Sequence, residues 1–276
     1  LKSVCKDYLM GEVTVRALKD VELEIAEQTF VSFVGPSGSG KTTLLNLIGC
    51  LDKPTSGEIS VANTVLNHFT SKDAALFRGK HLGFIFQNFN LLSVLTAYEN
   101  IEYPLIMVQN IPAKERREKV LYYLDAVGMA DQKDKYPGQL SGGQKQKVAI
   151  AGVLAMKPGC IILDESTSML DPVGRREVLE TIRFLNKNEN MTIVHITHHM
   201  DEACMADRVV VVDEGRIVVQ GKPEEVFSDV EKIESLGLDV PQVTRLLYNL
   251  KKEGLVDRIN IIDIDGAVEK LRSLIG

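Results

Sequence analysis

The sequence predicts an α/β protein built on a mixed β-sheet, and three patterns indicate this fold class. Three segments are largely apolar: residues 30–34, 160–163 and 192–196. Such runs are typical of parallel strands that helices cover on both faces. Residues 13–25 alternate apolar and polar side chains, which predicts antiparallel strands ahead of the first buried run. Two more apolar segments, 208–213 and 216–220, are joined by Glu214-Gly215 and predict a closing hairpin.

Helical segments follow the predicted strands. Apolar residues recur at helical spacing from Leu44 to Leu51, directly after a Gly-rich segment, so the chain there predicts a strand, a loop and a helix. The charged stretch 112–138 has one apolar face and predicts a peripheral helical region. We therefore expect a helical subdomain over about residues 90–155.

The character of the chain changes after Phe227. Residues 1–227 are expected to form one domain, and residues 228–276 a small α-rich appendage. Within the appendage, Asp239 is expected to cap a helix that has Pro241 in its first turn and that ends at Gly254.

Composition excludes several classes of protein. With 45% apolar and 25% charged residues, the 276-residue chain is neither disordered nor fibrous. Its net charge of −6 argues against nucleic acid as the main partner, although it leaves a local basic patch open. The four cysteines are scattered, which indicates a reduced cytosolic compartment without a zinc site. No apolar run reaches the roughly 18 to 20 residues that cross a bilayer, so a membrane role would need a partner.

The Gly-rich segment 35–42 has the pattern G-x-x-x-x-G-K-[ST] between a predicted strand and a predicted helix. Its backbone N–H groups and Lys41 are expected to bind phosphates, and Thr42 to ligate Mg²⁺. The predicted nucleotide-binding residues here are Gly35, Ser37, Gly38, Ser39, Gly40, Lys41, Thr42 and Thr43. The flanking elements disfavour the alternative of a plain turn with an exposed lysine.

The apolar run 160–163 ends in two carboxylates, Asp164 and Glu165. Asp164 can reach a Mg²⁺ ion, and Glu165 can polarise an attacking water. Taken alone, such a pair more often begins a solvated loop. Together with the phosphate-binding segment, it indicates a hydrolytic site.

Residues 140–144 read Leu-Ser-Gly-Gly-Gln and are expected to begin a helix. Ser141 is a suitable N-cap, and the two glycines allow close approach to an anion. By itself this segment is equally well interpreted as a flexible cap.

The phosphate loop, LSGGQ and ILDE in this order resemble the ABC ATPases over at least residues 1–226. The resemblance implies a P-loop NTPase fold of the ABC type, with an antiparallel β subdomain and a helical subdomain. It also implies a head-to-tail dimer, in which Ser141 and Gly143 of one chain face the γ-phosphate bound by Lys41 of the other. A lone monomer would be nearly inactive.

The same resemblance assigns roles to three further residues. Gln87 matches the glutamine that contacts metal and water and signals toward the membrane partner; the alternative is a buried core amide. Asp171 matches the loop that meets the opposite subunit, and it can also cap the helix that begins at Pro172. His198 matches the histidine that senses the γ-phosphate.

Three aromatic or imidazole side chains are less distinctive. Tyr8 precedes the strand near Val13 at the spacing of the aromatic that stacks on adenine; packing at a strand edge is the alternative. His195 and His199 have no counterpart in the resemblance and are expected to be structural or exposed.

Two subfamilies are resembled by different parts of the chain. Residues 1 to about 144 resemble the lipoprotein-release and macrolide-exporter type, and about 145 to 276 resemble the energy-coupling-factor type. This leads to the hypothesis of a mosaic, engineered or recombined, whose join lies near LSGGQ. One natural family that matches both halves equally well would overturn it. In the coupling-factor type, the tail from about 228 helps to hold two ATPase subunits together.

The resulting prediction is a transport-coupled ATP hydrolase that uses ATP and Mg²⁺. Its expected partners are a second ABC ATPase subunit and an integral membrane subunit, with no nucleic acid. It would be cytoplasmic and peripheral on the membrane, and its partner type stays open between uptake and export. The alternative, a soluble ABC ATPase of DNA repair or translation, is disfavoured because the chain has no long insertion and no second module. A purely regulatory nucleotide binder is disfavoured by Lys41, Asp164, Glu165 and His198 together.

Overall fold

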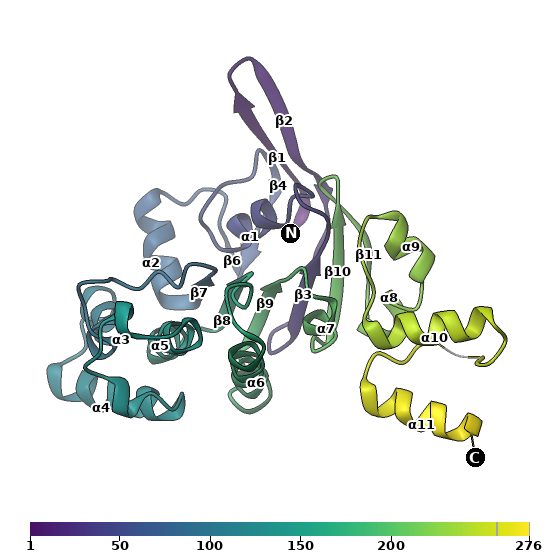
Figure 1. Cartoon of the computed structure of the whole chain (residues 1–276). Helices are drawn as coiled ribbons and strands as arrows, with labels where there is room; N and C mark the ends of the chain where they lie inside the picture. The colour runs from purple at the N-terminus through teal and green to yellow at the C-terminus, as the bar shows by residue number, and fades with distance from the viewer. Residues whose placement is uncertain (258, 276) are drawn as a thin grey trace.

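The computed structural model describes residues 1–257 and 259–275, with side chains up to residue 272. Its centre is a six-stranded sheet (Figure 1). In spatial order, the strands are β11 (Arg216–Gly221), β10 (Arg208–Asp213), β3 (Phe30–Val34), β9 (Thr192–Ile196), β8 (Cys160–Asp164) and β7 (Leu82–Phe86). Strands β10, β3, β9, β8 and β7 pair in parallel, and only β11 pairs antiparallel. The predicted mixed sheet and closing hairpin are therefore confirmed.

A second, antiparallel sheet lies beside the first and has the order β2-β1-β4. It consists of β1 (Lys2–Met10), β2 (Val13–Val21) and β4 (Ser56–Glu58), and a small ribbon of β5 (Ser60–Val61) and β6 (Thr64–Val65) follows. The predicted strand alternation extends too far, because β2 ends at Val21 while Leu23 and Ile25 lie outside it. Leu23 exchanges backbone hydrogen bonds only with Leu1, so its place in the pattern reflects burial.

Helices cover both faces of the six-stranded sheet. Helices that contact its strands include α1 (Lys41–Ile48), α2 (Ser71–His81), α5 (Gly142–Ala155), α6 (Pro172–Asn188) and the short α7 (Met200–Ala203). Helices α3 (Ala97–Met107) and α4 (Ala113–Ala126) pack mainly against α5. The helical region predicted over 112–138 consists of α4 and the 3₁₀ turns η1 (Ala130–Gln132) and η2 (Pro137–Gln139). Gly128 ends α4 in a left-handed conformation, with φ 68°, and its N–H bonds back to Asp125.

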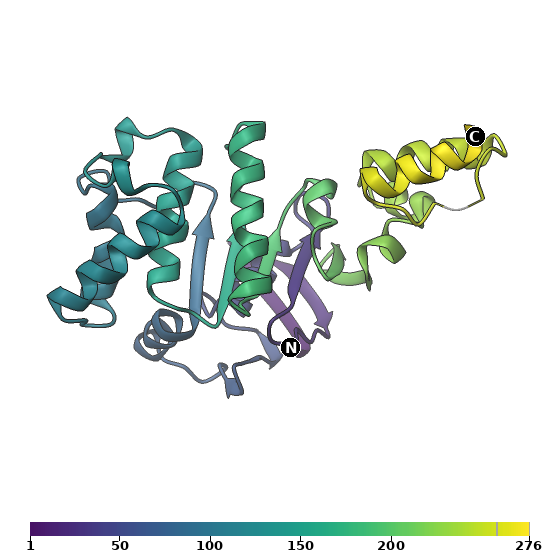
Figure 2. The ribbon, with the colours of Figure 1, turned by 90° about the horizontal axis from the view of Figure 1, so that it is seen from below.

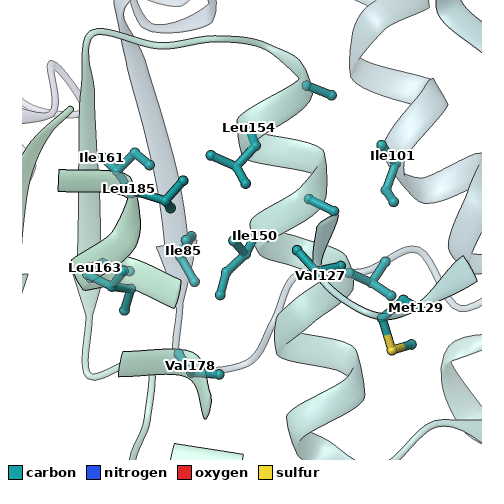
Figure 3. Close-up of a cluster of buried hydrophobic side chains, with 14 of the residues drawn as sticks. Ile85, Ile101, Val127, Met129, Ile150, Leu154, Ile161, Leu163, Val178 and Leu185 are labelled. Atoms are coloured by element: carbon teal, nitrogen blue, oxygen red, sulfur yellow. The ribbon is translucent and has the colours of Figure 1, made fainter. Parts of the chain in front are cut away.

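Two apolar cores lie on opposite faces of this sheet. Figure 3 shows one of them, where Ile150 and Leu154 of α5 face Ile85 and Leu163 of the strands. The other packs α1 and the antiparallel sheet on the opposite face, with Phe33, Leu44 and Leu45 fully buried. This burial on both faces explains why the strands are apolar at successive positions.

The C-terminal part contains α8 (Pro223–Val226), α9 (Val230–Ser235), α10 (Gln242–Lys252) and α11 (Ile264–Ile275). Figures 1 and 2 show α9 to α11 beyond the β10–β11 side of the sheet, away from α3 to α5. Phe227, Val230 and Ile233 are buried here and form an apolar cluster with Val209 and Val211 of β10.

The start of α10 differs from the prediction. Pro241 occupies the N-cap position, and the carboxylate of Asp239 accepts hydrogen bonds from the Val240 N–H at 2.8 Å and from Arg245 at 2.6 Å. The predicted cap by Asp239 is therefore wrong, because this carboxylate lies two residues before the N-cap and bonds to other groups. None of the helices in the described part of the chain has the length and apolarity to cross a membrane.

Candidate functional site

The phosphate loop connects β3 to α1, and its shape depends on glycine. Gly40 adopts φ 106° at the N-cap of α1, and a Cβ there would lie 2.8 Å from the carbonyl oxygen of Ala17. A Cβ on Gly35 would lie only 2.1 Å from the carbonyl oxygen of Val212. No other residue fits either position. The loop thereby presents the unpaired N–H groups of the first turn of α1, and Thr42 is exposed in that turn.

Lys41 lies half-buried within this loop. Its Nζ donates hydrogen bonds to the carbonyl oxygens of Gly35 and Pro36, both at 2.8 Å, and to Ser39 Oγ at 3.3 Å. Burial lowers the pKa of the Lys41 ammonium, while the nearby carboxylates of Glu165 and Asp164 raise it. The cation therefore lies between the phosphate loop and the two predicted acidic residues.

Two carboxylates follow the buried strand β8. Burial raises the pKa of Asp164, the charge of Glu165 raises it further, and Lys41 opposes both effects. Glu165 has φ 46°, a conformation that costs free energy for a residue other than glycine, and its N–H bonds to the carbonyl oxygen of Ile196 at 3.0 Å. The backbone is thus strained at the residue that the sequence selected as the general base.

His198 approaches Glu165 from the end of the neighbouring strand β9. Its Nδ1 lies 3.8 Å from Glu165 Oε2, and about half of its side chain is exposed. His199 lies beside it, with ring centroids 4.2 Å apart and the ring planes tilted by 40°. His195, by contrast, is fully buried, and burial lowers its pKa to about 4. Of the two possibilities left open by the sequence, structural or exposed, burial selects the structural one for His195.

Gln87 follows β7 directly. Phe86 pairs with Asp164 in the sheet, and Asp164 pairs with Ile196, so the residues that follow the three strands meet at one edge. Gln87 is exposed at this edge. Its alternative interpretation as a buried core amide is therefore wrong.

The LSGGQ segment begins α5 with a reciprocal cap. Gln144 N–H donates to Ser141 Oγ at 3.2 Å, and Ser141 N–H donates to Gln144 Oε1 at 3.0 Å. Asp171 caps α6 through a 2.7 Å bond from Gly174 N–H, as predicted. A Cβ on Gly143 would lie 3.4 Å from Gly174 Cα, so the first turns of α5 and α6 pack closely. No hydrogen bond among the described residues joins Ser141 or Gly143 to the phosphate loop of the same chain.

Comparison with known proteins identifies this arrangement. The model of the ABC transporter family matches residues 18–168, which is more than half of the chain. The chain belongs to the ABC transporter family.

Curated relatives extend the match to almost the whole chain. The energy-coupling factor transporter ATP-binding protein EcfA1 of Caldanaerobacter subterraneus is 45% identical over 260 residues, covering 91% of this chain and 90% of the relative. EcfA1 of Clostridioides difficile is 40% identical over 277 residues, covering 99% of this chain and 98% of the relative. In a solved dimeric ATP-binding cassette, MJ0796 bound to ADP and Pi, one chain superposes with a TM-score of 0.75 at 41% identity, covering 81% of this chain and 97% of that one. The predicted ABC fold and the predicted transport-coupled ATP hydrolase are confirmed.

The mosaic hypothesis has no such support. Relatives of one kind, EcfA1, match the ABC chain across both halves, and none of these matches supports a join near LSGGQ. The ABC protein MJ0796 of Methanocaldococcus jannaschii is also 42% identical over 223 residues. Differently named members of the family therefore match most of this chain at similar identity.

Tyr8 lies on β1 of the ABC domain, where it pairs with Val15. Its hydroxyl donates to Asp52 Oδ2 at 2.8 Å, and Lys6 Nζ lies 4.8 Å from its ring centroid. Burial raises the pKa of Tyr8, and the hydrogen bond to Asp52 raises it further. The ring is thus oriented at a strand edge, with a cation over its face.

The sequence did not predict a role for Glu202, which lies close to the site. Glu202 on α7 is only 2% exposed and contacts the segments that follow both β8 and β9. In the sequence it is one of two acidic residues at a helix start, a common pattern. Glu202 differs from its neighbour Asp201 in the structure, where Glu202 is buried and Asp201 is exposed.

A groove lies on another part of the ABC domain. This groove of about 1040 Å³ is lined by the first residues of the parallel strands, including Leu82, Cys160 and Thr192. It is therefore at the amino edge of the sheet, opposite the phosphate loop. Its residues do not include Lys41, Asp164, Glu165 or His198.

Proposed function

We propose that this chain is the ATP-hydrolysing subunit of an energy-coupling-factor type uptake transporter, in which two ATPase subunits drive an integral membrane subunit. The observation that carries the proposal is the extent of similarity. EcfA1 relatives match 91 to 99% of the chain, whereas MJ0796 matches 81%. The share that the Clostridioides difficile relative adds is similar in size to residues 228–276, which we propose as the dimerisation appendage of a 1–227 ATPase domain.

The chain's own groups account for binding of the nucleotide. The phosphate-loop N–H groups and Lys41 provide positive charge and donors for the β- and γ-phosphates. Thr42, Gln87 and Asp164 carry oxygen atoms, which are the donors that Mg²⁺ prefers, at the same edge of the sheet. Bound there, Mg²⁺ would neutralise phosphate charge. Tyr8 would stack on the adenine, and about 90–155 would form the helical subdomain.

Hydrolysis is assigned to Glu165 and His198. The Glu165 carboxylate would orient the attacking water and accept its proton. His198, 3.8 Å from that carboxylate, would hydrogen-bond the γ-phosphate. Gln87 lies at the same exposed edge, so it can respond to the metal and the water and contact the membrane subunit.

The second half of each site would come from the other ATPase chain. The first turn of α5 offers N–H groups beside Ser141 and Gly143, and Asp171 lies at the adjoining start of α6. A head-to-tail dimer would bring these groups to the γ-phosphate on the partner's phosphate loop. The four cysteines form no disulfides, which agrees with a cytoplasmic position on the inner face of the membrane.

Mixing two inactive variants tests the composite site. Lys41→Ala disables the phosphate loop, and Ser141→Arg disables the surface that faces it. In a mixed dimer of the two, one site combines an intact loop with an intact LSGGQ segment, so ATP turnover should return. A chain with both substitutions, mixed with Lys41→Ala, should restore nothing. If the wild-type chain is active and the mixture stays inactive, a composite site from two copies is wrong.

Co-expression tests the transporter type. We expect the chain to be retained on membranes with an energy-coupling-factor type membrane subunit and to stay in the soluble fraction without one. Retention only with a lipoprotein-export type subunit would contradict the uptake assignment while leaving the ATPase assignment intact.

A further inference from the structure

A buried polar cluster lies directly beneath the hydrolytic site, and Glu202 is its centre. Thr167 Oγ1 donates a 2.7 Å hydrogen bond to Glu202 Oε1, and Thr197 Oγ1 donates a 2.6 Å bond to Glu202 Oε2. Both threonine side chains are 1% exposed. The Glu202 carboxylate therefore joins two separate loops, because each of its oxygen atoms accepts a hydrogen bond from one of them.

These two loops carry the residues assigned to hydrolysis. Thr167 comes two residues after Glu165, and Thr197 immediately precedes His198. Glu165 is also bonded through its N–H to Ile196, the residue before Thr197. The relative position of the Glu165 carboxylate and the His198 ring thus depends on contacts that pass through Glu202.

The charge of Glu202 is balanced from α6. Arg175 Nε lies 3.6 Å from Glu202 Oε1. His195 Nε2 lies 3.5 Å from Oε2, but the buried ring, whose pKa falls to about 4, is neutral at physiological pH. Arg175 is in the first turn of α6, which Asp171 caps. The same carboxylate therefore also contacts the segment that is proposed to face the second ATPase chain.

A buried carboxylate lowers the stability of the folded chain unless other interactions offset its removal from water. Removing a carboxylate from water costs several kcal/mol, and well-packed apolar groups of similar volume often stabilise a fold at least as well. Hydroxyl donors to a carboxylate, by contrast, have short and directional bonds that set the position of the groups they join. Positioning is thus a better account of Glu202 than stability.

We propose that Glu202 is a positioning residue that holds the Glu165 loop and the His198 loop in register for ATP hydrolysis. The proposal rests on the function proposed above. Glu202 itself does not touch the nucleotide, and it acts through Thr167 and Thr197. Its loss should therefore lower the rate of the chemical step and leave ATP binding nearly unchanged.

The first test is Glu202→Gln, which preserves shape and removes the charge. We expect kcat to fall by about tenfold or more, because a misplacement of about 1 Å in reacting groups can cost 100-fold. The KM for ATP should stay within about twofold, since Lys41 and the phosphate loop are untouched. The matched control is Asp201→Asn, the same change of charge on the exposed neighbour, which should keep wild-type kcat.

A double-mutant cycle separates positioning from general destabilisation. If Glu202 acts through His198, then Glu202→Gln should lower kcat much less in a His198→Ala background than in the wild type. A merely structural role would lower kcat equally in both backgrounds. Equal losses, or a normal kcat in Glu202→Gln measured well below its melting temperature, would overturn the proposal.

Thr197 provides a second route in case Glu202→Gln does not fold. Thr197→Val removes the hydroxyl at nearly constant volume, and Thr197→Ser keeps it. We expect low kcat for the valine variant and rescue by serine; equal kcat in both would contradict the proposal. Absence of ATP turnover in the wild-type chain would instead contradict the proposed function, so the two failures are distinguishable.

Discussion

The two edges of the six-stranded sheet differ in a way that decides where the chemistry lies. At the carboxyl edge, the loops after β3, β8 and β9 bring Lys41, Asp164, Glu165 and His198 together. At the amino edge lies a groove of about 1040 Å³, lined by scattered residues such as Glu24 and Asn63. Groups of opposite charge therefore converge at the carboxyl edge, whereas the groove at the amino edge contains none of these four residues.

The reactive side chains at the two edges also differ in their surroundings. Glu165 adopts a positive φ, and its loop is bonded to a buried carboxylate. At the amino edge, burial raises the pKa of the Cys160 thiol to about 12, so this cysteine is no nucleophile at neutral pH. At the carboxyl edge, a catalytic candidate with a strained backbone and a buried carboxylate therefore lie in one cluster of loops.

The largest expected effect compares one glutamate from each edge. Glu165→Gln should lower ATP turnover by about 100-fold or more, because general base catalysis contributes about 10² to 10⁴. Glu24→Gln, the same chemical change in the groove, should leave turnover within about twofold of wild type. Steady-state ATPase assays measure both, and similar losses in the two variants would break the comparison.

A smaller effect compares one lysine from each edge. Lys41→Ala should weaken ATP binding by about 10- to 100-fold, since hydrogen bonds to charged groups contribute about 1.5 to 3 kcal/mol. Lys2→Ala, at the groove and with 76% of its side chain exposed, should leave the affinity unchanged. Calorimetric titration with ATP gives both dissociation constants. Unchanged affinity in Lys41→Ala would remove the phosphate loop from the binding site.

The smallest effect concerns stability and pH. His195 lies beneath the carboxyl edge with its pKa lowered from 6.5 to about 4, so between these values the unfolded chain binds more protons than the folded one. The free energy of unfolding should therefore fall as the pH is lowered from 7 to 5, with His195 contributing about 2 kcal/mol to the loss. Denaturant unfolding at both pH values measures it.

One histidine substitution tests this effect, and a second one is its control. His195→Asn should flatten the pH dependence, while His81→Asn, at the groove, should leave it as in the wild type. A wild-type pH dependence in His195→Asn would show that other groups cause the loss.

Local patterns predicted most elements of the fold. Apolar runs gave the buried strands because both of their faces are covered, and the G-x-x-x-x-G-K-T pattern gave the phosphate loop because only glycine fits at Gly35 and Gly40. The predictions for Asp239 and Leu23 were wrong because the same residue type can be found in more than one kind of local structure. Asp239 resembles a helix cap but bonds to Val240 and Arg245, and Leu23 continues an alternation without a strand partner.

The sequence by itself determined the ABC fold, the order of the motifs and the identity of the groups at the site, because these depend on short-range pattern and residue type. Only the tertiary structure decided which histidine is buried and which faces Glu165. It alone also placed Glu202 between Thr167 and Thr197. These features depend on contacts between segments distant in sequence, such as Thr167 with Glu202, and burial created by such contacts leaves no local trace in the chain.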